Sequence, residues 1–123
     1  MKNLIIVTGG AGFVGSNLIQ LLLDKTKCKI LSIDNYWTGK KNHIKSKRIK
    51  YINNNTKNIS KILKLNKKKI KVIFHFGEFS RIYQSFSKMN ECLDSNSVGS
   101  QKVFNFCLKN KISLFSHLCE YRQ

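Results

Sequence analysis

The stretch LIIVTGGAGFVG, residues 4–15, decides the fold, because an apolar run of strand length passes through three spaced glycines into a segment with apolar residues at helical spacing. A buried strand must therefore turn tightly into a helix. Gly9 permits the bend, Gly12 leaves room for a pyrophosphate beside the backbone, and Gly15 lets the helix approach the strand. The stretch predicts the first strand and helix of a dinucleotide-binding βαβ unit.

The start of this helix and the end of the next apolar run supply further candidate contacts. The first helical turn, at Phe13 and Val14, offers N–H groups and a partial positive charge to phosphates. Asp34 ends the run Ile30–Ile33, nineteen positions after Gly15, where a carboxylate accepts hydrogen bonds from ribose hydroxyls. Because a carboxylate repels a 2′-phosphate, Asp34 predicts NAD rather than NADP as the cofactor.

Apolar runs of strand length alternate with helical patterns along the rest of the chain. This alternation predicts an α/β fold, a Rossmann-like parallel sheet of strand order 3-2-1-4-5 that is incomplete at its C-terminal side. We expect strands at residues 3–8, 29–34, 49–52, 71–76 and 112–115, and helices near residues 13–25, 59–65, 81–89 and 91–110. The predicted core residues of the first and last helices are Val14, Leu18, Leu21, Leu22, Leu93, Val98, Val103 and Phe106 or Cys107.

The glycine spacing, together with Thr8 before it, resembles the extended short-chain dehydrogenase/reductase family, in particular its NAD-dependent nucleotide-sugar epimerases and dehydratases. The run His75–Arg81 is similar to a subgroup related to UDP-glucose 4-epimerase. The resemblance extends from residue 1 to about residue 112. It implies hydride removal from a sugar carbon by NAD, followed by hydride return.

The same resemblance implies additional cofactor contacts. Asn55 stands where the family has an aspartate that accepts a hydrogen bond from adenine, and an amide oxygen is also an acceptor. Asn96 resembles a helix-borne asparagine near the cofactor. The remaining contacts lie in the loop beside the adenosine ribose and in the turn after the fourth strand: Asn35, Thr38, Gly39, Phe76 and Gly77.

The family's catalytic residues have no match in this sequence. They are a Tyr-x-x-x-Lys on the helix after the fifth strand and a Ser or Thr at that strand's end, where Leu118 stands. Tyr36 and Lys40 match the spacing by letter, but Gly39 lies between them in a loop without helical register. We therefore expect residues 1–123 to be one truncated NAD-binding domain without the substrate domain. The chain is either part of an epimerase or dehydratase or, as the sequence favours, a non-catalytic remnant.

The net charge of +17, from 23 basic and 6 acidic residues, suggests an alternative function. A basic module would bind polyanions or nucleic acid, with residues 67–69 as candidate phosphate contacts. The lysines are spread along the chain, however, and enrichment in Lys, Asn and Ile without Pro is typical of an AT-rich genome. We expect no specific nucleic-acid partner, but nonspecific adhesion to polyanions at low salt.

The remaining patterns concern metals, location and association. Four cysteines and three histidines have no metal-ligand spacing, so we expect no metal. No signal peptide or bilayer-length apolar run is present, which predicts a cytoplasmic protein without a membrane partner. A nucleotide sugar would bind only if the missing domain were supplied. The fifth strand would be an uncovered edge of the sheet, and Leu114, Phe115, Leu118 and the helix face around Phe104 would be partly exposed. An uncovered apolar edge predicts self-association.

Overall fold

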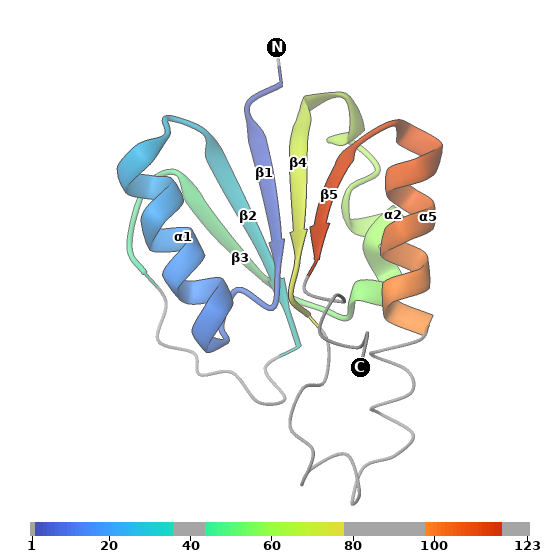
Figure 1. Ribbon diagram of the computed structural model, residues 1–123, viewed down its shortest axis with the longest axis horizontal. Helices are drawn as coiled ribbons and strands as arrows, with labels where there is room; N and C mark the ends of the chain where they lie inside the picture. The colour runs from blue at the N-terminus through green and yellow to red at the C-terminus, as the bar shows by residue number, and fades with distance from the viewer. Residues whose placement is uncertain (1, 36–43, 78–97, 117–123) are drawn as a thin grey trace, which may run out of the picture.

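A computed structural model describes residues 2–35, 44–77 and 98–116, which form one sheet with helices on both of its faces (Figure 1). The strands are β1 (Leu4–Thr8), β2 (Lys29–Asp34), β3 (Ile49–Asn53), β4 (Ile70–His75) and β5 (Ser113–Ser116). The α-helices are α1 (Phe13–Lys25), α2 (Ile59–Ile62) and α5 (Ser100–Asn110), and the short 3₁₀ helices are η1 (Thr56–Asn58) and η2 (Lys67–Lys69).

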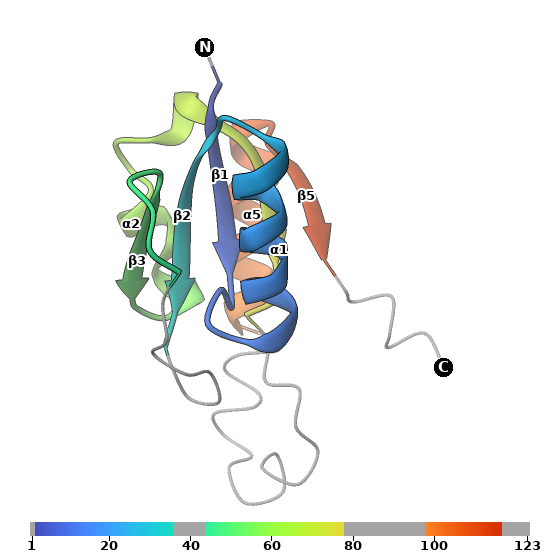
Figure 2. The ribbon, with the colours of Figure 1, turned by 90° about the vertical axis from the view of Figure 1, so that its left-hand side faces the viewer.

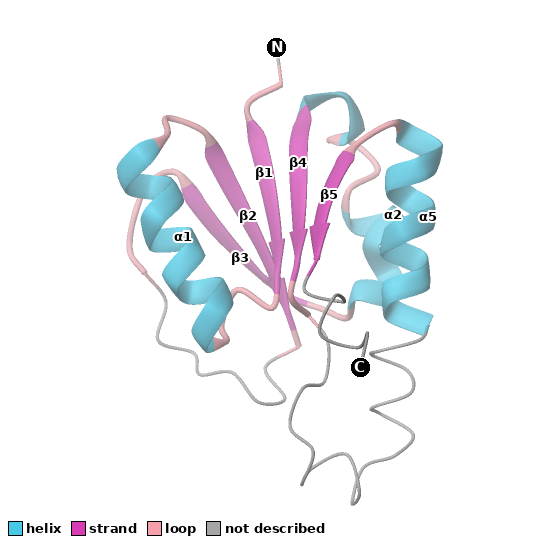
Figure 3. Ribbon diagram, viewed as in Figure 1, coloured by secondary structure: helices cyan, strands magenta, loops and turns pink. Residues whose placement is uncertain are grey.

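All five strands are parallel and follow the order β3-β2-β1-β4-β5 (Figure 3). The predicted α/β fold class, strand order and open C-terminal side of the sheet are confirmed. Parallel strands bring their carboxyl ends to one edge of the sheet and their amino ends to the other. We call these the carboxyl edge and the amino edge.

Two apolar clusters fill the space between the sheet and its helices. Helix α1 covers one face, where the buried residues are Ile5, Val7, Ile19 and Ile30. Helices α2 and α5 cover the opposite face (Figure 2). Its buried residues are Ile6, Leu31, Ile33, Ile59, Leu63, Ile70, Ile73, Val103, Phe106, Cys107 and Ile112.

The predicted core face of α1 is wrong at two positions. Val14 and Leu21 are 56% and 52% exposed, whereas Gly15 and Ile19 are the buried residues of this helix. Gly15 lies against the backbone of Gly9 in the turn, whereas Ile19, Leu18 and Leu22 pack on the sheet, and this orientation of the helix leaves Val14 exposed. In α5 the prediction is correct for Val103, Phe106 and Cys107.

Two other assignments differ from expectation. Helix α2 ends at Ile62 instead of residue 65, because Ile59 and Leu63 already fill the space below the sheet and a turn returns the chain to β4. Val98 is 40% exposed, contrary to its assignment as core. The predicted helix at residues 81–89 and Leu93 lie outside the described residues.

Strand β5 forms one border of the sheet, and no described helix stands over it on the side of α1 (Figure 2). Phe115 is 59% exposed and its ring stacks on that of Phe74 with a centroid separation of 5.4 Å. Leu114 and Phe104 are half-buried, and Leu118 lies outside the described residues. Among the described helices, none is long and apolar enough to cross a bilayer.

Candidate dinucleotide site

Backbone hydrogen bonds close the turn between β1 and α1. The N–H of Gly9 donates to the carbonyl of Ile33 at 2.8 Å, which ties the turn to β2. The N–H of Gly12 donates to the carbonyl of Gly9 at 3.1 Å, and the N–H of Ser16 donates to that of Gly12 at 2.9 Å. The glycine motif therefore forms the predicted strand, turn and helix at the carboxyl edge.

Gly9 and Gly15 are required by the fold itself. Gly9 has a φ of +73°, and a Cβ atom added there would lie 2.6 Å from the carbonyl oxygen of Phe76 and 2.9 Å from the nitrogen of Gly77. The turn after β4 thus lies directly against Gly9. A Cβ atom on Gly15 would collide with the carbonyl oxygen of Gly9. Any side chain at these two positions would push the turn and the helix apart.

Gly12 differs because the fold leaves space beside it. The nearest atom to an added Cβ is the carbonyl oxygen of Gly9 at 3.4 Å, an ordinary contact. Gly12 is the extended N-cap residue of α1, and within the described chain no side chain caps this helix. The N–H groups of the first turn, including those of Phe13 and Val14, have no acceptor within the helix. An open space next to such N–H groups fits a phosphate.

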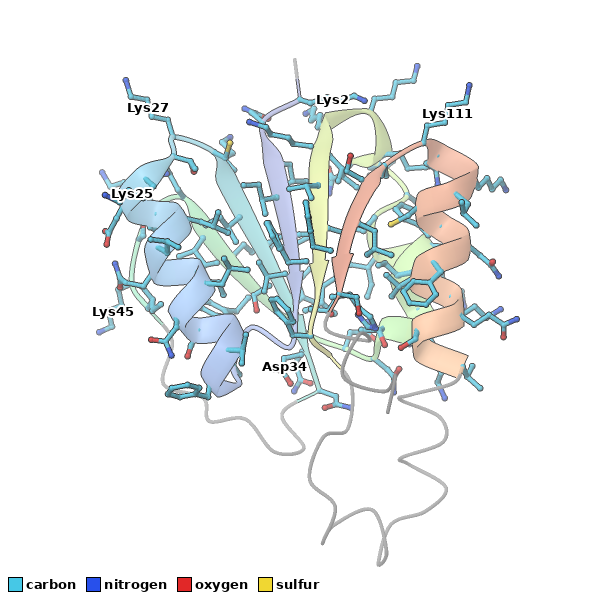
Figure 4. All side chains as sticks on the ribbon, viewed as in Figure 1. Lys2, Lys25, Lys27, Asp34, Lys45 and Lys111 are labelled. Carbon is cyan, nitrogen blue, oxygen red and sulfur yellow. The ribbon has the colours of Figure 1, made fainter. Side chains whose placement is uncertain are left out.

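Asp34 is held beside this turn at the end of β2. Its Oδ2 accepts the N–H of Ala11 at 2.9 Å, so the carboxylate and the glycine turn have a fixed relation. Its backbone carbonyl accepts the N–H of Asn54 at 3.0 Å, which connects the end of β2 to the chain after β3. Asp34 lies at the carboxyl edge (Figure 4), where the motif predicts a ribose-binding carboxylate.

The two asparagines of the predicted site have different surroundings. Asn35 is exposed next to Asp34. The Oδ1 of Asn55 caps η1 by accepting the N–H of Lys57 at 3.0 Å. A carbonyl oxygen has two lone pairs, so the Oδ1 of Asn55 retains capacity for a second donor such as an adenine amino group. Its role in adenine binding stays a prediction.

A buried hydrogen-bond network joins the turn after β4 to the rest of the site. The Oγ1 of Thr8 accepts the N–H groups of Phe76 at 3.0 Å and Gly77 at 2.9 Å. Since these two bonds occupy both lone pairs, the hydroxyl donates its proton to His75 Nδ1, 2.6 Å away. His75 is therefore the Nε2–H tautomer, and it donates to the Oγ of Ser100 at 2.9 Å.

This network fixes three segments at the carboxyl edge: the end of β1, the turn after β4 and the start of α5. Thr8 and His75 are both fully buried. Its hydrogen bonds make His75 a structural residue of the turn after β4. No sequence pattern predicted the role of Ser100, which lies 25 residues further along the chain.

Sequence reasoning also missed the pair formed by Gly10 and Ser32. A Cβ atom added to Gly10 would collide with the Oγ of Ser32, which lies in the middle of β2. Ser32 is buried, and its Oγ has no hydrogen-bond partner in the described part of the chain. A small residue interrupts an otherwise apolar strand at this position, and that interruption is the signal that predicts a close approach by a neighbouring turn.

Several predicted residues lie outside the described residues, namely Tyr36, Thr38, Gly39, Lys40, Asn96 and Leu118. Among the residues that are described, no group of three His, Cys, Asp or Glu side chains is placed to hold a metal. Burial raises the pKa of Cys107 to about 11, so this thiol stays protonated in the core.

Comparisons with known proteins point to one family. The sequence model of the NAD dependent epimerase/dehydratase family matches residues 5–119. An ADP-L-glycero-D-manno-heptose-6-epimerase of Brachyspira hyodysenteriae is 34% identical over 116 residues, which cover 91% of this chain and 36% of that protein.

Solved structures agree with the fold. The UDP-glucose 4-epimerase of Thermotoga maritima, crystallised with UDP-glucose, has a TM-score of 0.81 at 20% identity, over 92% of this chain and 37% of its own. Bordetella bronchiseptica WbmG, crystallised with NAD, has a TM-score of 0.79 at 25% identity, over 94% and 37% of the two chains. The present chain spans just over a third of the length of these relatives. The family match over most of its residues shows that the chain belongs to the NAD dependent epimerase/dehydratase family.

Proposed function

We propose that residues 1–123 form the NAD-binding part of a nucleotide-sugar epimerase or dehydratase, and that this segment alone binds NAD without converting a sugar. The observation that carries the proposal is the space beside Gly12. It is bordered by the N–H groups that begin α1, and the carboxylate of Asp34 is fixed to the same turn through Ala11.

Each described residue of the candidate site has a role in the proposed binding of NAD. The pyrophosphate lies beside Gly12 and accepts N–H groups of the first turn at Phe13 and Val14. Asp34 accepts hydrogen bonds from the adenosine ribose, and Asn35 and Asn55 lie on the adenine side. Phe76 and Gly77, held by Thr8, border the nicotinamide side. We assign Thr38, Gly39 and Asn96 to the same site from the family resemblance.

Bound NAD supplies a hydride acceptor, whereas the residues of this segment bind and orient it. At the end of the fifth strand, where the family has a catalytic Ser or Thr, this sequence has Leu118. General acid–base catalysis contributes about 10² to 10⁴ in rate. A nucleotide sugar as substrate is supported by the similarity to an ADP-heptose epimerase and by the UDP-glucose complex of the Thermotoga maritima enzyme.

Calorimetric titration of NAD into the purified chain tests the proposal. We expect saturable binding, and NADP should bind about tenfold more weakly, a difference of about 1.4 kcal/mol, because Asp34 repels its 2′-phosphate. Gly12→Val should abolish binding by filling the phosphate space, and its urea-unfolding midpoint should stay close to that of the parent chain.

Turnover is measured on the same samples with a panel of UDP-sugars and ADP-sugars. We expect no product above the Gly12→Val background. Equal affinity for NAD and NADP, or unchanged binding in Gly12→Val, would contradict the assigned site. Product formation above that background would contradict the non-catalytic assignment.

A further inference from the structure

Exposed lysines gather at the amino edge, although they are evenly spread in the sequence. The amino ends of the strands, and the ends of α1 and α5 that precede two of them, meet there. Figure 4 shows Lys2, Lys27 and Lys111 projecting from this edge, opposite Asp34. The exposed lysines that lie within three residues of the first residue of a strand, or in the last turn of α1 or α5, are Lys2, Lys25, Lys27, Lys29, Lys47, Lys50, Lys67, Lys68, Lys69, Lys71, Lys109 and Lys111. We call this set the amino-edge lysines.

Acidic residues do not neutralise this set. The described residues include two carboxylates, Asp24 and Asp34. Asp34 lies at the opposite edge beside Ala11, and Asp24 accepts a hydrogen bond from Gln20 on α1. Within the described ranges, none of the amino-edge lysines forms an ion pair. The amino edge therefore presents a concentrated and uncompensated positive charge to solvent.

Composition alone does not account for this placement. An AT-rich bias explains how many lysines the chain has, and it predicts the same density in every exposed segment. The segments 36–43, 78–97 and 117–123, which follow β2, β4 and β5, contain five basic and four acidic residues and are close to neutral. Nearly all of the net charge of +17 thus belongs to the described elements, and the fold collects most of it at one edge.

We propose that the amino edge binds the phosphate backbone of a nucleic-acid duplex without sequence preference. Five strands about 4.8 Å apart make an edge about 20 Å across before the flanking helices are added. Duplex DNA carries one negative charge per ~1.7 Å of its axis, so this width faces on the order of ten phosphates. The number of amino-edge lysines matches that charge.

The neighbouring side chains favour duplex backbone over other polyanionic surfaces. Asn3, Ser46 and Asn66 stand among the lysines and are typical phosphate donors. The exposed aromatic residues of the described chain, Phe13 and Phe115, lie elsewhere, so the edge lacks a stacking platform for single-stranded bases.

A lipid surface is a poorer match for the same edge. Leu65 and Leu108 are 90% and 78% exposed, but they lie on separate elements. A helix that binds the membrane surface instead presents a continuous apolar face. The polar residues and lysines between the two leucines suit contact with phosphates better than burial in acyl chains.

Duplex binding at this edge leaves the dinucleotide site open. Strands of five or six residues separate the two edges by about 17–20 Å, which is more than two Debye lengths of about 8 Å at physiological ionic strength. The amino-edge lysines therefore exert little electrostatic influence on Asp34 or on the turn at Gly12. NAD and a duplex should bind independently.

The test uses fluorescence anisotropy with a labelled 20-base-pair DNA duplex across a salt series. The edge variant carries Lys67→Gln, Lys68→Gln and Lys69→Gln, and a matched control carries Lys57→Gln, Lys61→Gln and Lys102→Gln, three exposed lysines away from the edge. Both lose the same charge. We expect the edge variant to reduce the slope of log K against log salt by about 2 to 3, and the control to reduce it by less than 1.

Four outcomes would overturn the proposal. They are equal losses in the two variants, no duplex binding by the parent chain at 50 mM salt, tighter binding to phosphatidylserine vesicles than to the duplex at equal salt, and competition between NAD and the duplex. If the edge variant fails to fold by circular dichroism, Lys109→Gln with Lys111→Gln, matched to Lys61→Gln with Lys102→Gln, makes the same comparison.

Discussion

The two edges of the sheet are built in opposite ways from the same five strands. At the carboxyl edge, turns are pressed together by glycines and by buried hydrogen bonds, so that backbone groups and the Asp34 carboxylate have fixed positions. At the amino edge, lysines extend into solvent without ion pairs in the described chain. The carboxyl edge thus suits a ligand of defined shape, whereas the amino edge suits a polyanion that is bound through its charge alone.

This difference predicts how each edge tolerates substitution. At the carboxyl edge, an added side chain destabilises the fold where neighbouring atoms already fill the space, and it blocks the cofactor where the space is open. A change at the amino edge affects charge and leaves stability close to its starting value.

Gly15→Val should have the largest effect on stability. Its side chain would collide with the backbone of Gly9, which has no freedom to move because the turn after β4 lies against it. We expect a loss of about 4 kcal/mol or more, measured by urea unfolding. Gly12→Val is the matched control in the same turn and should cost about 1 kcal/mol or less. Equal losses at both positions would contradict the separation of fold and cofactor roles.

Thr8→Val removes the hydroxyl at the centre of the buried network while keeping its shape. The N–H of Gly77 and the Nδ1 of His75 would lose the hydroxyl, at about 1–3 kcal/mol for each buried group, whereas the N–H of Phe76 would keep its bond to the backbone carbonyl of residue 8. We expect a total loss of about 3 kcal/mol and weaker NAD binding. Thr8→Ser retains the hydroxyl and should recover most of both. If it did not recover them, packing and not hydrogen bonding would be the cause.

Arg48, unlike the amino-edge lysines, is held at this edge by hydrogen bonds to protein atoms. Its Nη1 donates to the carbonyls of Thr26 at 2.8 Å and Cys28 at 3.1 Å, and its Nη2 donates to that of Leu23 at 2.6 Å. These carbonyls lie at and just beyond the C-terminus of α1, where a cation is favoured.

Because Arg48 is held by protein atoms, Arg48→Met should lower the free energy of unfolding by about 2 kcal/mol. Lys47→Met, at the exposed neighbouring residue, should change it by less than about 0.5 kcal/mol. Thermal melts of the two variants give the comparison directly. A loss of similar size in Lys47→Met would show that the amino-edge lysines contribute to folding.

Much of the fold could be predicted from the sequence because its signals are local. The apolar run before Thr8, the glycine spacing and the alternation of strands with helices determine strand order and the position of the turn. The buried face of α1 was predicted wrongly at Val14 and Leu21, since periodicity gives a face but not the rotation that Gly15 imposes on it.

The site was predictable where one residue acts through its own backbone or charge, as Gly12 and Asp34 do. It was not predictable where residues distant in sequence meet. Ser100 receives its role from His75, and Ser32 is small because Gly10 lies against it. The amino-edge lysines were hidden for the same reason, because only the parallel arrangement of strands brings them together.

Titration of the ¹⁵N-labelled chain with NAD, followed by NMR, distinguishes the two edges residue by residue. We expect shifts in the amide signals of Gly9, Gly12, Phe13, Val14, Asp34 and Gly77, while those of Lys27, Lys69 and Lys111 stay unchanged. Shifts concentrated at the amino edge, or no saturable shift at any amide of the glycine turn, would contradict the assignment of the NAD site to the carboxyl edge.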